Sequence, residues 1–391
     1  MPKRSGFIRI CLGAALGALL LLLSQSRIDH AQATSAISTP VATEASSVST
    51  AEAPAPLYPL PIEMGGKWGY MDTTGKVVIP PQFDHARPFY GGLAEVSIDK
   101  QGAYIDPSGA VVIQPQFEDA ADFHDGMAVV ILKDKGGWGF IDTTGKFVIP
   151  LQQKYDNWHP FSEGLAAVNK GAYWGFIDKT GKVVIPLKYR WEGGDFHEGL
   201  AEVPVADTQG WGSIDEKGKV IIRGTSGDFS EGLSPWRDYS KEPAKFGYVD
   251  TTGKLVIQPQ FDMAGSFSEG LAVVVVDLKS GYIDKTGAFV IQPQFSYADP
   301  FHDGLAAVWN KDESGNGPFY GKYSYVDTSG KVVIQPEANS PNPTNEKIET
   351  NPFDTGVAFN EGMAVIEVGQ IGHYKYGYID TTGKVIWEPS N

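Results

Sequence analysis

The sequence predicts an all-β protein made of repeated small units, and three observations predict this class. A motif of the form aromatic-Gly-aromatic-Ile-Asp-x-x-Gly recurs nine times, with small variations, along the chain. The segments around each copy are rich in β-branched and aromatic residues and are bounded by glycine or proline. The 391 residues include 46 glycines and 26 prolines, a mixture that suits short strands and tight turns. We therefore expect three-stranded β-meander, or hairpin, units repeated along the chain.

In every copy of the motif the aspartate is followed, three residues later, by a glycine. The nine aspartates are Asp72, Asp106, Asp142, Asp178, Asp215, Asp250, Asp284, Asp327 and Asp380. The Asp carboxylate can accept the backbone amide two residues on, and glycine can adopt the left-handed conformation that closes a short hairpin with a bulge. These nine Asp-x-x-Gly turns predict nine hairpins.

Alternation along the strand before each turn separates its two faces. An aromatic residue lies two positions before the aspartate in eight copies, and Ser213 is the exception. The other face carries Ile, Val or Met one position before the aspartate. Both faces are apolar enough to be buried, so neighbouring units must pack on one another. We also expect the glycine beside the tryptophan to permit close approach of another backbone segment.

A second repeated element, Phe-x-x-Gly-Leu/Met, appears eight times between Phe89 and Phe359. Seven copies place an acid directly before the glycine, and these acids are Asp125, Glu163, Glu198, Glu231, Glu269, Asp303 and Glu361. We interpret them as solvated turn residues. The alternative is a stripe of carboxylates that a cation or a partner recognises, so they are candidate binding residues.

Two arrangements of the units compete, an open or superhelical stack and a closed ring of the β-propeller type. The first seven aspartates are spaced by 34 to 37 residues, whereas a propeller blade has four strands and ~40–45 residues. Nine units also exceed the ~4–8 blades of typical propellers. Closed propellers often divide one blade between the chain ends, but here the array begins on a hairpin at Lys67 and ends on one at Trp387. We therefore expect the open stack, with the closed ring as the alternative.

The amino terminus has the composition of an export segment. Residues 1–33 combine a basic start, an apolar run from Ile10 to Leu23 and a small-residue cleavage signal at 31–33. We expect a signal peptide there, with an uncleaved signal anchor as the alternative and no other membrane insertion. Residues 34–60 are rich in Ser, Thr, Ala and Pro and predict a disordered linker. Residues 61–391 form the repeat domain, so we expect an extracytoplasmic protein of the periplasm, the cell surface or the medium.

The repeated residues carry a family resemblance. Gly137 to Lys146, followed by the element that begins at Phe161, resembles the WG-repeat, or KWG-repeat, family of bacterial β-rich repeats. The resemblance extends over roughly residues 64–389. Four copies depart from the Trp-Gly pair, at 102–103, 246–247, 280–281 and 323–324. It implies an extracytoplasmic or interaction-type repeat protein, and it supplies no catalytic residues.

The motifs and the charge narrow the class of function. No hydrolase elbow, zinc-protease helix, phosphate-binding loop or dinucleotide turn is present in the sequence, and we expect neither a catalytic site nor a cofactor. The aspartates lack the ligand density of a calcium loop, and the histidines near the Phe elements form a broken row, so no metal is predicted. The formal charge is −15 and becomes −18 without residues 1–33, which argues against nucleic acid.

We therefore expect a non-enzymatic binding or scaffold surface for an unidentified protein or glycan partner. One alternative is a carbohydrate-binding cell-wall module that uses repeated aromatics, with Trp68, Trp138, Trp174 and Trp211 as candidates. A tryptophan at a fixed repeat position is more often part of a core. The other alternative is an enzyme whose site is built from the late insertions at 310–322 and 337–352.

Overall fold

The computed structural model describes residues 58–132, 137–152, 154–190, 193–205, 210–239, 242–311, 321–335, 358–370 and 373–388. The predicted signal peptide, nearly all of the predicted linker and most of the two late insertions lie outside these ranges. All described strands belong to one compact unit, Ala55–Asn391. None of the described residues forms a helix that could cross a membrane.

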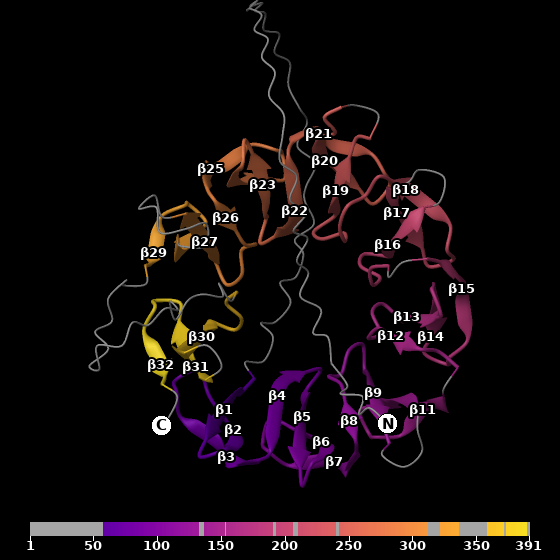
Figure 1. Cartoon of the computed structure of the whole chain (residues 1–391), viewed down its shortest axis with the longest axis vertical. Coiled ribbons are helices and arrows are strands. Elements are labelled where there is room, and N and C mark those ends of the chain that lie inside the picture. Colours follow the sequence, from indigo (N-terminus) through magenta and orange to yellow (C-terminus); the bar gives the residue numbers. More distant parts are fainter. Residues whose placement is uncertain are drawn as a thin grey trace, which may run out of the picture. The chain divides into compact units, whose positions relative to one another are not determined.

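The described strands form nine small antiparallel sheets, which we call blades 1 to 9 in chain order (Figure 1). Blades 1 to 4 contain β1 (Leu60–Met64), β2 (Lys67–Met71) and β3 (Val77–Phe83); β4 (His85–Tyr90), β5 (Leu93–Ile98), β6 (Gln101–Ile105) and β7 (Val111–Phe117); β8 (Asp119–Ala120), β9 (Met127–Ile131), β10 (Trp138–Asp142) and β11 (Phe147–Gln152); and β12 (Asn157–Trp158), β13 (Leu165–Lys170), β14 (Tyr173–Asp178) and β15 (Val183–Tyr189). Blades 5 to 9 contain β16 (Leu200–Val205), β17 (Gly210–Asp215) and β18 (Val220–Arg223); β19 (Leu233–Arg237), β20 (Phe246–Asp250) and β21 (Leu255–Phe261); β22 (Met263–Ser268), β23 (Leu271–Val276), β24 (Lys279–Asp284) and β25 (Phe289–Phe295); β26 (Tyr297–Ala298), β27 (Leu305–Lys311), β28 (Gly321–Asp327) and β29 (Val332–Ile334); and β30 (Met363–Gln370), β31 (His373–Asp380) and β32 (Val385–Trp387).

The blades close into a ring, so the expected open stack is wrong and the closed alternative is correct (Figure 1). Hydrogen bonds and apolar contacts between described residues join blade 9 to blade 1. The Tyr378 hydroxyl donates to the Pro61 carbonyl at 2.9 Å. The Tyr58 amide donates to the Glu361 carboxylate at 3.0 Å. Ile62, Met71, Met363 and Tyr378 form one buried cluster. Closure needs no divided blade, because each end blade keeps its own strands and the two pack face to face.

The unit of three strands is correct for four blades and incomplete for five. Blades 2, 3, 4, 7 and 8 add a fourth strand before the three expected ones. In Figure 1 this extra strand lies on the side toward the ring centre, and the strand after each Asp-x-x-Gly turn lies outermost. Three of the five extra strands, β8, β12 and β26, are only two residues long. Such a short pairing leaves almost no alternating pattern in the sequence.

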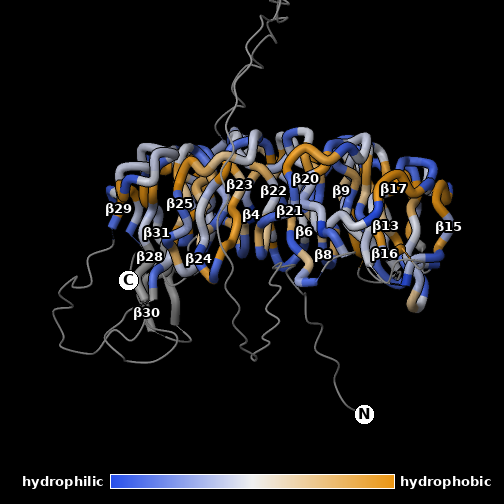
Figure 2. The backbone as a smooth tube through the Cα atoms, turned by 90° about the horizontal axis from the view of Figure 1, so that it is seen from above, coloured by the Kyte–Doolittle hydropathy of each residue, from blue (hydrophilic) through white to orange (hydrophobic). Residues whose placement is uncertain are grey.

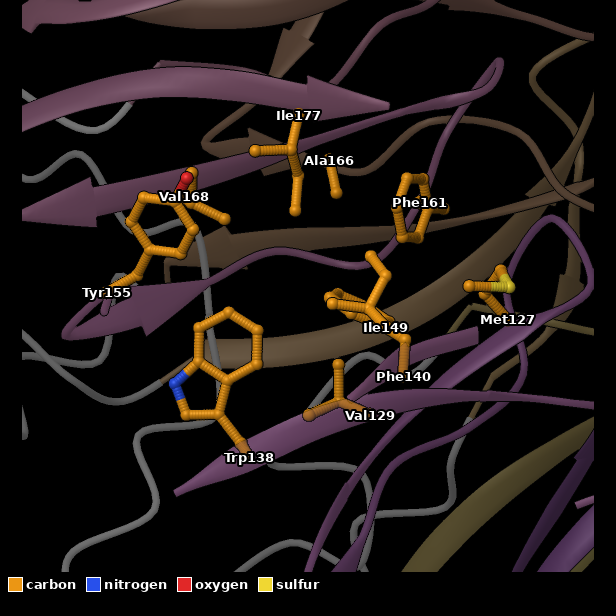
Figure 3. Packing of buried hydrophobic residues seen from close by; sticks show 10 residues of the cluster. All are labelled: Met127, Val129, Trp138, Phe140, Ile149, Tyr155, Phe161, Ala166, Val168 and Ile177. Carbon is orange, nitrogen blue, oxygen red and sulfur yellow. The ribbon is translucent and has the colours of Figure 1, made fainter. Parts of the chain in front are cut away.

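The core consists of layers between neighbouring blades. One layer joins Trp138, Phe140 and Ile149 of blade 3 to Phe161 and Val168 of blade 4 (Figure 3). The aromatic residue two positions before the aspartate is buried in each blade where it occurs, for example Tyr70, Tyr104 and Tyr282 at 0% exposure. Both faces of a blade therefore pack against other blades, one against the preceding blade and the other against the following blade.

The outermost strands show a regular alternation of buried and exposed side chains. In β3, β15, β21 and β25 the pattern is the same, with the third and seventh residues buried and the second and fourth exposed. Seen edge-on, the ring is a disc whose tube changes repeatedly between hydrophobic and hydrophilic colours (Figure 2). The period of two is the sequence signal from which strands were predicted.

Candidate functional site

The Asp-x-x-Gly turns have the predicted conformation. In blade 3, one Asp142 carboxylate oxygen accepts the Thr144 amide at 2.9 Å, the Thr144 hydroxyl at 2.5 Å and the Lys146 amide at 3.1 Å. These bonds, the Thr144 hydroxyl first, hold the pKa of Asp142 below its usual value. Gly145 has φ +82°, and register shifts mark a bulge between β10 and β11. The aspartates are therefore used within their own turns.

The glycine of each turn has a second role that the sequence analysis missed. A Cβ built on Gly145 would lie 3.0 Å from Cγ2 of Ile113, in the outermost strand of blade 2. A similar contact with an isoleucine side chain of the preceding blade recurs in the later turns, whereas at Gly75 the nearest atom is the Ile386 carbonyl oxygen of blade 9, at 2.7 Å. The recurring pair of Gly and Ile is visible in the sequence, but only the structure shows that the two residues meet.

The glycine beside the tryptophan also has the predicted role. A Cβ on Gly139 would meet the Ile149 carbonyl oxygen at 2.7 Å and the Leu151 amide at 3.0 Å, both in the adjacent outermost strand. The backbone of β11 therefore crosses β10 closely at the bulge. This glycine allows the hairpin to bend, so the Trp-Gly pair has a structural explanation within its own blade.

The acids that precede the glycine of the Phe-x-x-Gly-Leu/Met element lie in two-residue turns, which we call acid–glycine turns. Around Glu163 and Gly164, the Ser162 and Leu165 backbones exchange both hydrogen bonds, at 2.9 and 3.1 Å. Glu163 and Gly164 have φ +51° and +85°, as the two central residues of a type I′ hairpin turn require. Their own amides therefore point away from the hairpin and need other acceptors.

The acceptor comes from the preceding blade, a role that the sequence analysis did not predict for these acids. Glu163 of blade 4 accepts the Glu198 and Gly199 amides of blade 5 at 2.7 and 2.8 Å. The remaining bonds join Asp125 to Gly164, Glu198 to Gly232, Glu231 to Gly270, Glu269 to Gly304, Asp303 to Gly362 and Glu361 to Tyr58. All seven candidate acids thus make hydrogen bonds between blades.

Both kinds of turn lie on one face of the ring, which we call the turn face. In the antiparallel meander, one strand follows the acid–glycine turn and the next strand ends at the Asp-x-x-Gly turn, so the two turns lie at the same end. Two lysines from Asp-x-x-Gly turns confirm this, because Lys179 contacts the Asp125 carboxylate at 2.8 Å and Lys285 contacts Glu231 at 3.0 Å. The connection that enters the strand ending at each of the nine aspartates lies on the opposite face, and we call it the opposite-face connection.

The four candidate tryptophans lie near that opposite face, away from the acids. In blade 3, Trp138 pairs with Ile131, whereas Asp142 at the other end of the strand pairs with Met127, next to the acid–glycine turn. Trp138 is 7% exposed and its ring packs beside Tyr155 (Figure 3). The others, Trp68, Trp174 and Trp211, are partly exposed in three different blades. The structure therefore does not bring the tryptophans and the acids together.

The histidines near the Phe elements form separate contacts. His159 pairs with Asp195 at 2.9 Å and packs edge-on against Trp174. His124 packs on Tyr90 with ring centroids 5.5 Å apart. Serines at the equivalent position, such as Ser162, donate to the Phe carbonyl of the next blade. Among the described residues, no group of three or more His, Cys, Asp or Glu side chains is placed to hold a metal ion.

The sequence analysis missed two glutamates, the buried Glu95 and the partly buried Glu202. Burial raises the pKa of each to about 7. Arg87 lies 3.4 Å from Glu95, and the Gly227 amide donates to Glu202 at 3.0 Å. In both blades the glutamate occupies a position of the Leu-Ala-x-Val strand that holds Val or Ala in most other copies. A glutamate at a position that is otherwise apolar was the sequence signal by which these two residues could have been found.

The boundary between blades 5 and 6 is irregular. Blade 5 has Ser213 where other blades have a buried aromatic residue, and its hydroxyl donates to Thr225 at 3.0 Å. A shallow hollow of about 360 Å³ lies at this boundary, lined by apolar residues of β18 and β20 together with Arg223, Trp236 and Thr252. It holds no pair of acidic or nucleophilic side chains.

Comparison with known proteins identifies the repeat and finds distant likenesses of structure. The family described as WG containing repeat matches more than half of the chain, at residues 68–101, 103–135, 138–174, 174–203, 246–278, 281–308 and 323–337. Apo AztD from Citrobacter koseri is similar at 12% identity and TM-score 0.40, over 75% of this chain and 90% of that one. Hsv2 from Kluyveromyces lactis is similar at 9% identity and TM-score 0.35, over 60% and 94% of the two chains. Comparison with curated protein sequences gives no match.

Proposed function

Because the chain belongs to the WG-containing repeat family and closes into a ring of nine blades, we propose that it is a non-enzymatic binding or scaffold protein. The proposed partner is a protein or a glycan, and the proposed place of action is outside the cytoplasm, after export by residues 1–33. The described surface would serve as a rigid platform, because every blade is held by contacts on both of its faces.

One observation carries the proposal. The repeated acids make hydrogen bonds within and between blades on the turn face, whereas the connections that differ in length among blades lie on the opposite face. The acid–glycine turns all have two residues. The opposite-face connections range from two residues, Asp99 and Lys100, to the nine residues 312–320. The chain also leaves the opposite face after Ile334, where the second late insertion begins. Recognition usually depends on loops held by a rigid scaffold.

In this proposal the acid–glycine turns and Trp138 stabilise the ring and do not bind the partner. The seven carboxylates satisfy amides of neighbouring blades, and Trp138 belongs to the core. The polysaccharide alternative depends on Trp68, Trp174 and Trp211, which are partly exposed. These three side chains lie in different blades, so a glycan would have to extend along the ring to reach two of them.

The test compares two variants of the full chain. In the first, residues 312–320 are replaced by Asp-Lys, the turn that joins β5 to β6; in the second, Lys217→Ala changes the turn face only. Both are immobilised and exposed to detergent extracts of the cell envelope and to a glycan array. We expect a specific partner that is retained by the wild type and by Lys217→Ala and is lost from the loop variant. Retention of no partner, together with turnover of a substrate, would sink the proposal.

A further inference from the structure

Within the described residues, the series of inter-blade carboxylate bonds misses the turns of blades 2 and 3. Blade 1 has no acid–glycine turn to supply the Gly91–Gly92 turn of blade 2, where Gly92 is partly buried. Blade 2 has Gly91 where the other acid–glycine turns have an acid. The turn of blade 3, at Asp125 and Gly126, therefore receives no carboxylate from the preceding blade. From the gap at blade 3 we infer that the Asp125–Gly126 turn is a binding site for the carboxylate of another polypeptide.

The backbone of this turn has the same conformation as the turns that do bind a carboxylate. Asp125 and Gly126 have φ +51° and +74°, and Glu198 and Gly199 of blade 5 have φ +54° and +78°. His124 and Met127 exchange both hairpin hydrogen bonds at 2.9 Å. In blade 5 the two central amides bind the two oxygens of Glu163. The blade 3 turn thus presents the same pair of donors in the same arrangement.

The donor is accessible in blade 3 and covered elsewhere. Gly126 is exposed, whereas the glycines that receive a carboxylate are partly buried, and these are Gly164, Gly199, Gly232, Gly270, Gly304 and Gly362. Within the part of the chain that the structure describes, the Gly126 amide has no carboxylate acceptor. Successive backbone amides in such a left-handed turn form a concave anion-binding site.

The surroundings of the turn favour an anion despite the acidic chain. Lys179 of blade 4 donates to the Asp125 carbonyl at 2.6 Å and lies 2.8 Å from its carboxylate. The same carboxylate accepts the Gly164 amide at 2.6 Å. The negative charge of Asp125 is therefore offset by a cation and a donor on its far side, and it is directed away from the Gly126 amide toward blade 4.

An aromatic pair from both blades borders the site. Tyr90, directly before Gly91, is 43% exposed and packs on His124, directly before Asp125. An acidic residue entering the turn would pass this pair, so its neighbouring side chains would contact an apolar wall. We assign the ligand class as a peptide carboxylate, from either a glutamate or aspartate side chain or a free C-terminus, since both present the same two oxygens.

The test is a titration of the isotope-labelled full chain followed by amide NMR. The probes are an end-blocked alanine peptide with one central glutamate, its glutamine analogue, and a blocked-amine peptide with a free C-terminus. We expect a saturable downfield shift of the Gly126 amide with a carboxylate peptide and none at Gly164, whose amide is occupied. The glutamine peptide should bind at least about tenfold more weakly, because hydrogen bonds to a charged acceptor are roughly twice as strong. Comparison of the first and third probes identifies the preferred source.

Two variants give a matched control. Gly91→Glu restores the acid found in the other blades, at a φ of +58° that those acids also adopt, and should abolish the shift. Gly91→Gln has the same size without charge and should leave binding by the peptide largely intact.

An unmoved Gly126 amide, equal shifts with the glutamate and glutamine peptides, or a Gly91→Glu variant that responds like the wild type would each overturn the inference. If Gly91→Glu fails to fold, the peptide comparison on the wild type decides alone. The variant that replaces 312–320 should respond like the wild type, which separates this site from the proposed function.

Discussion

Two separate constraints act on the glycine that ends each Asp-x-x-Gly turn. Gly145 has φ +82°, a conformation that costs an L-residue about 1–2 kcal/mol. It also leaves only 3.0 Å between a built Cβ and Ile113 of the preceding blade. Gly164 in the acid–glycine turn has a similar φ of +85° and nothing within 4 Å of a built Cβ. The two residues therefore separate backbone strain from blade packing.

We predict that Gly145→Ala destabilises the protein more than Gly164→Ala. Both variants place an alanine at a positive φ and lose stability through backbone strain. Only Gly145→Ala also forces a methyl group against Ile113, and overpacking typically costs a further ~1–3 kcal/mol. Urea unfolding of the two variants beside the wild type measures the difference. Equal losses would mean that the neighbouring blade yields to the extra methyl group, and that the glycine is needed for the turn alone.

The partly buried glutamate of blade 5 gives a prediction about pH. Burial raises the folded-state pKa of Glu202 from its usual 4.5 to about 7. A carboxyl pKa that is higher in the folded state means that ionisation opposes folding. The resulting loss of stability is fully present above pH 7, and it disappears as the pH falls below the pKa of the unfolded chain. At one pKa unit per 1.36 kcal/mol, the cost above pH 7 is of the order of 1–3 kcal/mol.

We therefore expect Glu202→Gln to raise the free energy of unfolding at pH 8 and to leave it nearly unchanged at pH 4.5. Glutamine keeps an acceptor for the Gly227 amide, so the main change is the removed charge. Glu216→Gln, an exposed side chain in the turn of the same blade, controls for net charge. A stability difference that is independent of pH between 4.5 and 8 would contradict the burial argument.

At the scale of the element, the hairpin was predictable because its information is local. Asp142, Thr144 and Gly145 are within four residues of one another, and their turn forms as the sequence indicated. The inter-blade role of Glu163 was not predictable, because the two amides that donate to its carboxylate lie 35 and 36 residues further along the chain. A single sequence shows that the acid recurs, but recurrence fits a solvated turn and a contact between blades equally well.

The short inner strands were missed for a related reason. β8, β12 and β26 have two residues each, too few for a period of two to be visible. The other two inner strands, β4 and β22, have six residues each, so the length of the inner strand differs from blade to blade.

At the scale of the molecule, closure uses contacts of the same kinds as those within the ring, but on different atoms. Gly75 meets the Ile386 carbonyl oxygen first, whereas Gly145 meets the Ile113 side chain. The Tyr378 hydroxyl binds the Pro61 carbonyl within β1, whereas Tyr282 binds the Asp299 carbonyl, which follows the inner strand β26. The duplicated hairpins at the two chain ends suggested an open stack, since no divided blade was present. In fact complete blades close the ring, because the Tyr378 hydroxyl and the apolar side chains of the last blade find partners in the first.

No chain connection spans the contact between blades 9 and 1, unlike the contacts between the other neighbouring blades. We predict that Tyr378→Phe and Tyr282→Phe each cost about 1 kcal/mol, the usual net value of one hydrogen bond, and more where the carbonyl stays buried. Only Tyr378→Phe should also raise hydrogen exchange in β1, β2 and β32, because blades 1 and 9 can then separate without unfolding the rest. Tyr282→Phe should leave exchange in those strands unchanged, since the connection between blades 7 and 8 limits local opening. Exchange that increases equally in both variants at the chain ends would show that the ring opens as one cooperative unit, and that the junction of blades 9 and 1 is no weaker than any other.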